Sequence, residues 1–220
     1  MCFSAGASFA SGVVLSSIGI ITVKEIHNPS QKVFALIPIL FGIQQLSEGC
    51  LWLTLSGSDF FLVRRICSYI FLMTAQTLWS WMIPLSVLLM EEEAWRRKIL
   101  RIMLVVGIVL SLYYSYFLVF HNVTSRIMDC HILYTTESPE FLALPTFIFY
   151  LAVTIAPFFV SSIRKMYFLG IIMALSCLLA AVFYKLYLTS VWCFFAAIIS
   201  VFIYLIIRES KKTYTSINKS

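Results

Sequence analysis

The chain has 220 residues, of which 61% are hydrophobic and only 12% are charged, and its mean hydropathy is +0.94. This composition provides too little polar surface to cover a soluble globule and too much apolar surface for a disordered chain. The formal net charge is +6, but the basic residues form no stripe on a binding fold, so nucleic acid is not an expected partner. We therefore predict an integral membrane protein.

The apolar runs are long and unbroken, which favours spanning helices over a barrel of alternating polar and apolar residues. A spanning helix needs about 20 residues, and this length predicts seven spans along the chain. The first is short and rich in Ser and Gly, so six spans is the alternative. The predicted fold class is all-α, a polytopic membrane bundle of seven transmembrane helices: Ala7–Val23, Val33–Leu55, Leu62–Met90, Ile99–Phe120, Leu142–Ile163, Met166–Tyr184 and Thr189–Ile207.

The orientation of the bundle follows from its basic residues, which are retained on the cytoplasmic side of a membrane. An N-terminus outside and a C-terminus inside gives the outer segments only Arg64, Arg65, Arg126 and Lys185. The twelve inner basic residues are then Lys24, Lys32, Arg96, Arg97, Lys98, Arg101, Arg164, Lys165, Arg208, Lys211, Lys212 and Lys219. We predict a multi-pass protein of the cell membrane, with residues 1–208 as the transmembrane domain and 209–220 as a polar cytoplasmic tail.

A run of charges, EEEAWRRK from Glu91 to Lys98, separates the third and fourth predicted helices. We expect a solvated helical continuation with pairs four residues apart and Trp95 at the headgroup level; docking of a cytoplasmic partner is the alternative. The basic excess on this side predicts the lipid bilayer's anionic headgroups as partners.

The outer side holds the candidate metal ligands. The connection from His121 to Phe141 contains His121, Asp129, Cys130 and His131, and Cys2 lies on the same side. These residue types suit zinc, which makes zinc the possible cofactor, but their spacing matches no recognised zinc motif, and an ordinary hydrogen-bonded loop is the alternative.

The sequence allows three interpretations of Cys2: a tolerated thiol, a disulfide with Cys130 in an oxidising compartment, and a ligand or reactive thiol. The other four cysteines, Cys50, Cys67, Cys177 and Cys193, are predicted to be small packing residues.

A polar stripe interrupts the second predicted helix in the stretch FGIQQLSEGCLW. Glu48 lies well inside the span, where a carboxylate is costly and normally faces the bundle interior or a water-filled cavity. Gln44 and Gln45 precede Glu48 by four and three residues, which places all three on one side of the helix, with Trp52 one turn further out.

The third predicted helix carries partners for this stripe. Gln76 is expected to meet Gln44, and Arg64 or Arg65 to reach toward Glu48. One interpretation is a set of polar contacts that join helices, each contributing about 0.6–2 kcal/mol. The other is a functional carboxylate that carries a proton, binds a ligand or acts as a general base, because a glutamine would join helices without the cost of a charge.

Two motifs carry a resemblance to a known group. The opening MCFSAGASFASG and the later IQQLSEGCLWL resemble an uncharacterised family of small bacterial polytopic membrane proteins, which begin MCFSATASF and carry a QQxxEGxxW stretch. The resemblance covers residues 1–55 and departs at Gly6. It implies that five residues belong to one feature, without implying an activity: Cys2, Ser4, Gln45, Glu48 and Trp52.

These observations predict a polar pocket open to the extracytoplasmic side, bounded by the Cys2 segment, Glu48 and the loop from Asp129 to His131. The first hypothesis is a metal-assisted membrane hydrolase or redox enzyme with Glu48, Gln45 and Cys2 as catalytic residues and a small molecule or lipid as ligand. The second is a small-solute or proton-coupled carrier in which Glu48 titrates, although no inverted repeat supports it. A non-catalytic sensor or scaffold is the third.

Overall fold

The computed structural model describes residues 4–55, 60–128, 131–137, 139–183 and 196–217. Within these ranges the chain is mainly helical, and six stretches are helices long and apolar enough to cross a membrane. In chain order the elements are α1 (Ala5–Lys24), the short 3-10 helix η1 (Pro29–Gln31), α2 (Lys32–Leu55), α3 (Phe61–Leu72), the π-helical η2 (Met73–Leu78), α4 (Trp79–Met90), α5 (Ala94–Phe120), β1 (Val123–Met128), β2 (His131–Thr136), α6 (Glu140–Val160), α7 (Arg164–Phe183) and α9 (Ala196–Ile217).

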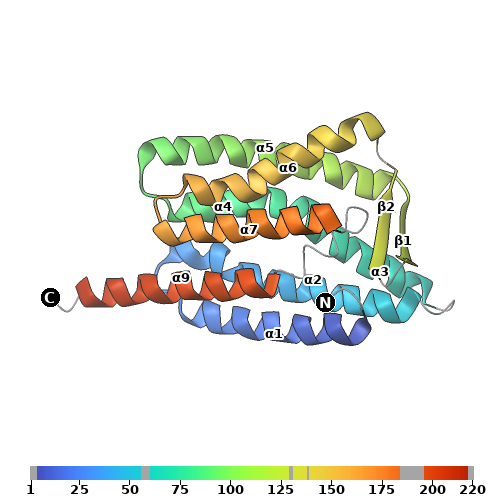
Figure 1. The fold of residues 1–220 in the computed structure, drawn as a ribbon, viewed down its shortest axis with the longest axis horizontal. Helices are drawn as coiled ribbons and strands as arrows, with labels where there is room; N and C mark the ends of the chain where they lie inside the picture. Colours follow the sequence, from blue (N-terminus) through green and yellow to red (C-terminus); the bar gives the residue numbers. More distant parts are fainter. Residues whose placement is uncertain (1–3, 56–59, 129–130, 138, 184–195, 218–220) are drawn as a thin grey trace.

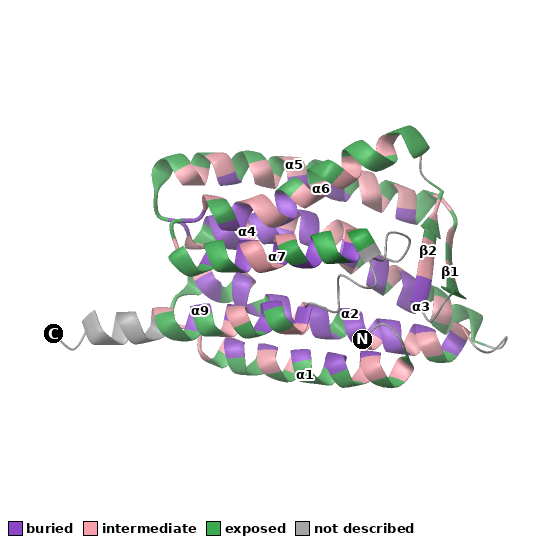
Figure 2. Cartoon of the chain, in the orientation of Figure 1, coloured by how far each residue is buried: buried purple, intermediate pink, exposed green. Residues whose placement is uncertain are grey.

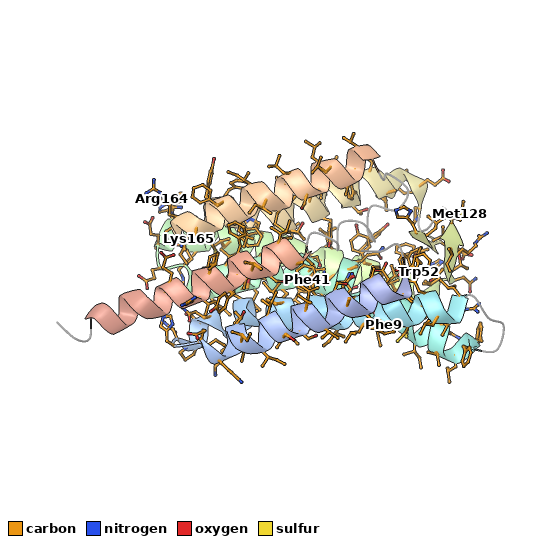
Figure 3. The ribbon with its side chains drawn as sticks, turned by 60° about the horizontal axis from the view of Figure 1, so that its bottom comes forward. Phe9, Phe41, Trp52, Met128, Arg164 and Lys165 are labelled. Atoms are coloured by element: carbon orange, nitrogen blue, oxygen red, sulfur yellow. The ribbon has the colours of Figure 1, made fainter. Side chains whose placement is uncertain are left out.

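The long helices run along one axis and alternate in direction (Figure 1). Helices α1, α2 and α9 pack together, while α4 to α7 form a second group that joins the first through α2, α4, α7 and α9. We call the end with the α1–α2, α4–α5 and α6–α7 connections the basic end, because Lys24, Lys32, Arg96, Arg97, Arg164 and Lys165 lie there. The opposite end, with the start of α1 and the strands β1 and β2, is the hairpin end. Figure 3 shows Arg164 and Lys165 at the basic end and Trp52 and Met128 at the hairpin end.

The ends of the chain differ from the predicted spans. Helix α1 begins earlier than predicted, because the Ser4 hydroxyl caps it by accepting a hydrogen bond from the Ala7 backbone N–H at 3.2 Å. The seventh predicted span, Thr189–Ile207, lies partly outside the described residues. Its described part belongs to α9, which continues beyond the predicted end as far as Ile217 because no Pro or Gly interrupts it. Beyond Ile207, an ion pair between Lys165 and Glu209 ties α9 to the start of α7.

Small residues let α1 and α2 approach each other closely. A Cβ atom added to Gly42 would lie 2.9 Å from the Ser16 backbone nitrogen and even closer to the Ser16 hydroxyl, and one added to Gly12 would lie 2.7 Å from the Leu46 side chain. Cβ atoms essentially never lie this close to another atom, so a larger residue at Gly42 would displace the α1 backbone and one at Gly12 would displace the Leu46 side chain. Close contact of this kind is how helices associate without a hydrophobic driving force in lipid.

The third spanning stretch is a single helix, α3–η2–α4, with a π-helical segment at its middle. A π turn adds a residue and displaces carbonyl groups from the regular hydrogen-bond ladder. The hydroxyl of Tyr150, on α6, donates to the Ala75 carbonyl in this segment at 2.5 Å.

The predicted outer loop folds into a β-hairpin, which is a difference from the expected connection without strands. Strands β1 and β2 pair antiparallel, from Val123 opposite Thr136 to Met128 opposite His131. The hairpin lies against α3, where Tyr134 stacks on Phe71 with ring centroids 4.6 Å apart and the Ser125 and Ser68 hydroxyls are 2.7 Å apart.

Candidate functional site

The polar stripe of α2 is enclosed in the helix bundle. Gln44 and Glu48 have 0% of their surface exposed and Gln45 has 1%. Helix α2 contacts α1, α3, α4 and α9, which cover it on most sides (Figure 2). All three side chains are therefore buried, and their placement on one side of the helix stays a prediction.

A hydrogen-bonded chain connects α1 to the buried carboxylate. The Ser11 hydroxyl donates to Gln45 Oε1 at 3.1 Å, and Gln45 Nε2 donates to Glu48 Oε2 at 3.3 Å. The Gln45 side-chain amide thus accepts a hydrogen bond from α1 and donates one to the carboxylate of Glu48 on its own helix, α2. Serine and glutamine are the residue types that form such interhelical contacts in membranes.

A second polar contact joins α2 to α4. The Trp79 indole Nε1 donates to Gln44 Oε1 at 3.0 Å, and the Trp79 ring packs on Phe41 with centroids 4.3 Å apart. The sequence predicts Gln76, on the third spanning stretch, as the partner of Gln44. The partner in the structure is Trp79, on the same stretch. Trp79 lies one turn beyond Gln76. A buried indole N–H needs an acceptor, but the sequence does not show that this acceptor is Gln44.

The two arginines of α3 have different environments. Arg64 Nη2 donates to the Thr54 carbonyl at 2.7 Å, so this side chain reaches back to the end of α2. The Arg65 guanidinium lies 5.8 Å from the centre of the Tyr69 ring. Glu48 is seven residues before the end of α2 at Leu55, which corresponds to roughly 10 Å along the helix axis. The carboxylate is therefore much nearer the hairpin end than the basic end.

The buried hydroxyl of Ser8, on α1, has no hydrogen-bond partner among the described residues. Ser8 lies one turn before Ser11 and is 0% exposed. The neighbouring Phe9 ring fits against Gly49, next to Glu48 in the chain. A polar group is therefore available in the part of α1 that packs beside the carboxylate.

The predicted metal ligands are only partly visible, since Cys2, Asp129 and Cys130 lie outside the described residues. His121 follows α5, where its ring stacks on Phe117 and its Nδ1 is 4.0 Å from Glu137 Oε2. His131 begins β2 and is 7% exposed.

The hairpin separates these two histidines. His131 pairs with Met128 at one end of the strands, whereas His121 precedes Val123 at the other, so about 17 Å of strand lies between them. In the described ranges no three His, Cys, Asp or Glu side chains are grouped closely enough to hold a metal ion. The structure therefore does not bring the two histidines together in one metal site. A metal site formed by Cys2, Asp129 and Cys130 stays a prediction.

A second buried carboxylate lies at the basic end, in the charge run predicted to be solvated. Glu91 has extended backbone after α4 and is 1% exposed. Its Oε2 accepts from the Ser162 backbone N–H at 2.6 Å, and its Oε1 from the N–H groups of Glu92 and Glu93 at 3.2 and 3.1 Å. The prediction of a solvated helical run is thus wrong for Glu91, which joins the α4–α5 and α6–α7 connections.

Burial raises the pKa of Glu91, but the hydrogen bonds from Ser162, Glu93 and Glu92 outweigh it and hold the pKa below the ordinary carboxyl value. Nearby, Arg97 donates to the Glu91 carbonyl at 3.0 Å and Arg96 to the Val160 carbonyl at 2.7 Å. The three acids directly before a helix are a sequence signal of its N-terminus.

The fold and its enclosed polar stripe define a polytopic helical membrane protein. The chain belongs to the family described as "Family of unknown function (DUF6629)", which matches residues 1–218. No curated protein and no solved structure matches the chain.

Proposed function

We propose that the protein is a multi-pass protein of the cell membrane, with the hairpin end outside and the basic end in the cytoplasm. The basic residues at one end support this orientation through their retention on the cytoplasmic side. At the hairpin end the exposed aromatic side chains Tyr116, Phe120 and Phe141 are suited to the membrane interface. Six described helices are long and apolar enough to cross a membrane, and a seventh crossing would end in α9, which runs back toward the basic end in Figure 1. Anionic lipid headgroups are the partners that the basic end would attract.

Within this arrangement, Glu48 is the group that binds a proton or small cation, in a carrier-type site reached from the hairpin end. The observation that carries the proposal is a fully buried glutamate inside a spanning helix, bonded by Gln45, which itself is bonded by Ser11. A glutamine would serve the same contact without the cost of placing an ionisable group in the membrane. The buried Ser8 hydroxyl adds a polar group with no partner among the described residues.

The alternative enzyme hypothesis requires Cys2 and the outer loop. With the two described histidines at opposite ends of the hairpin, the geometry favours the carrier. A scaffold in which Glu48 only joins helices is the outcome that the experiment must exclude.

The test compares the wild type with Glu48→Gln in mild detergent. We expect both to fold, but the melting temperature of the wild type to change more than that of the variant with added Na⁺, K⁺, Mg²⁺ or Ca²⁺ or with pH between about pH 6 and pH 9. Exposed carboxyls do not titrate in this range, and the histidines and thiols that do are present in both proteins. Infrared difference spectra should show a carboxyl band that the variant lacks.

Glu91→Gln is the matched control, because it removes a buried carboxylate at the opposite end. It should keep the ion or pH response and the infrared band. Equal responses of the wild type and Glu48→Gln would leave Glu48 as a contact between helices and reject the proposed function.

A further inference from the structure

A buried serine of α1 lies at the same depth in the bundle as Glu48. Ser11 and Gly12 both contact α2, and Ser8 precedes them by three and four residues, which places it one turn earlier on the same face of α1. The two helices run in opposite directions (Figure 1), and Ser11 is bonded to Gln45. Ser8, three residues before Ser11, therefore lies at the depth of Glu48, three residues after Gln45.

A second contact between the two helices gives the same register. A Cβ atom added to Gly49 would lie 3.1 Å from the Phe9 ring. The residue that follows Ser8 on α1 thus meets the residue that follows Glu48 on α2. Two separate contacts therefore agree that Ser8 and Glu48 lie opposite each other across the interface.

Packing alone does not explain a serine at this position. Ser8 is 0% exposed, and its Oγ has no hydrogen-bond partner among the described residues. Ser11 and Ser47, which are also buried in these two helices, are bonded to backbone carbonyls of their own helix. A buried hydroxyl without a partner costs free energy, so alanine would fill the same space at a lower cost. The Ser8 hydroxyl is therefore available to a ligand of Glu48.

The groups around Glu48 suit a proton better than a metal cation. A hard cation is held by about six oxygen atoms, whereas Gln45 turns its Nε2, a hydrogen-bond donor, toward Glu48 Oε2 at 3.3 Å. The Ser8 hydroxyl can both accept and donate a hydrogen bond, which the transfer of a proton requires. Carboxylates inside membrane spans commonly belong to proton pathways.

The elements that pack on α2 bring no second acid to this depth. Helix α4 and η2 contain no charged or titratable residue, and those of α9 begin at Tyr204 and lie toward the basic end. The charged and titratable residues of the other elements in contact with α2 are Lys24 of α1, Arg64, Arg65, Cys67 and Tyr69 of α3, and Arg126 of β1. None of these is a carboxylic acid. In the described elements that pack on α2 near the hairpin end, Glu48 is thus the acid that can take up a proton.

We propose that the species bound at Glu48 is a proton and that the Ser8 hydroxyl passes it to the carboxylate from the hairpin end. This inference rests on the proposed function and names the ligand of Glu48. A hydronium ion on the hairpin side protonates Ser8 Oγ, and the original hydroxyl proton moves to a carboxylate oxygen of Glu48. One O–H bond forms and one breaks at Ser8, which is left unchanged, while hydronium becomes water and the carboxylate becomes a carboxyl group.

Ser8 and Glu48 are not hydrogen-bonded to each other in the structure. A rotation of the Glu48 side chain or one bridging water completes the path. Release of the proton follows the same steps in reverse.

The test is the rate at which the Glu48 carboxyl exchanges its proton for deuterium. Wild-type protein in mild detergent, at a pH where the carboxyl band is present, is mixed with D₂O buffer, and the downward shift of that infrared band is followed over time. Its absence in Glu48→Gln assigns the band. In Ser8→Ala we expect the same band with an exchange rate about tenfold or more below the wild-type rate, because one proton-transfer group is lost.

Two further variants make the result specific. Ser47→Ala removes a buried hydroxyl next to Glu48 in the chain that is bonded to the Gln44 carbonyl at 2.7 Å, and it should exchange at the wild-type rate. Ser8→Cys keeps a similar side-chain volume but has a thiol, which is a weak donor, and it should slow exchange as Ser8→Ala does. Looser packing would admit water and make exchange faster, so slower exchange identifies the loss of the relay.

The outcomes separate this proposal from the proposed function. Exchange in Ser8→Ala at or above the wild-type rate, or slower exchange that Ser47→Ala shares, would overturn the role of Ser8. A wild-type melting temperature that responds to Na⁺, K⁺, Mg²⁺ or Ca²⁺ but not to pH would overturn the proton as ligand. In both cases Glu48 would remain a binding group. A wild type that matches Glu48→Gln in its infrared spectrum and in its ion and pH responses would reject the proposed function, and this proposal with it.

Discussion

Replacing Glu91 should destabilise the protein strongly although the residue lies outside the spanning helices. In Glu91→Ala the backbone N–H groups of Ser162, Glu92 and Glu93 lose their acceptor. Each of these hydrogen bonds involves a charged carboxylate, and such bonds contribute about 1.5–3 kcal/mol when counted singly. Because the Glu92 and Glu93 groups are near water, we expect a total loss of about 3 kcal/mol rather than the full sum.

In a chain of this size, 1 kcal/mol changes the melting temperature by about 2–4 °C, so Glu91→Ala should melt about 6–12 °C below the wild type. Glu91→Gln keeps one acceptor oxygen and should lose less. The assay is thermal unfolding in detergent, followed by tryptophan fluorescence. Glu92→Gln is the matched control, since Glu92 is exposed in the same connection and should melt like the wild type.

The same contact predicts a pH dependence. Because the folded-state pKa of Glu91 is lowered, its stabilisation is complete above the ordinary carboxyl pKa, near pH 4–5, and is lost as the pH falls through the folded value. The gap in melting temperature between the wild type and Glu91→Gln should therefore be widest at neutral pH and close on acidification. A gap that is absent at neutral pH, or that stays constant into acid, would refute the reasoning.

Further predictions concern packing, the site and orientation. Gly42→Leu should prevent α1 from docking on α2, because the side chain would occupy the space of Ser16, and the yield of monodisperse protein measures it; a normal yield would contradict the close approach. Trp79→Phe removes the donor to Gln44 and should cost about 1–3 kcal/mol in thermal unfolding, and an unchanged melting temperature would show that this bond contributes nothing. A reporter fused after Ser220 should read cytoplasmic and one inserted near Thr136 external, the reverse pattern being incompatible with the proposed orientation. Elemental analysis of the purified protein tests the zinc hypothesis. One zinc per chain would support the predicted zinc ligands of the outer segments, and the absence of zinc would contradict them.

The sequence predicts those parts of the fold that depend on local composition. Unbroken apolar runs locate the spanning helices because lipid leaves the backbone no other partner, and the spacing of Gln44, Gln45 and Glu48 places them on one side of α2. Ser11 and Trp79, the residues that bond this stripe, could not be identified in this way, because their contacts depend on how α1 and α4 pack on α2.

The hairpin and the buried Glu91 escape prediction for the same reason. The residues of β1 and β2 form strands while packing against Phe71 and Ser68 of α3, and strand preference depends on such surroundings more than on the residues themselves. The sequence alone does not distinguish Glu91 from its neighbours Glu92 and Glu93, because all three are carboxylates in one charge run. Only the approach of Ser162 from a distant connection distinguishes Glu91.

The close contact of α1 and α2 has a consequence for biosynthesis. Helix α2 carries three buried polar side chains that lipid would not solvate, so it is poorly suited to enter the bilayer alone. Helix α1 leaves the ribosome before α2 and presents Ser11 to Gln45 over the surface where Gly12 and Gly42 permit contact. Pairing with a helix already in the membrane would lower the free-energy cost of inserting α2. Helices α1 and α2 would then insert as a pair, with α1 providing the polar contact that α2 needs.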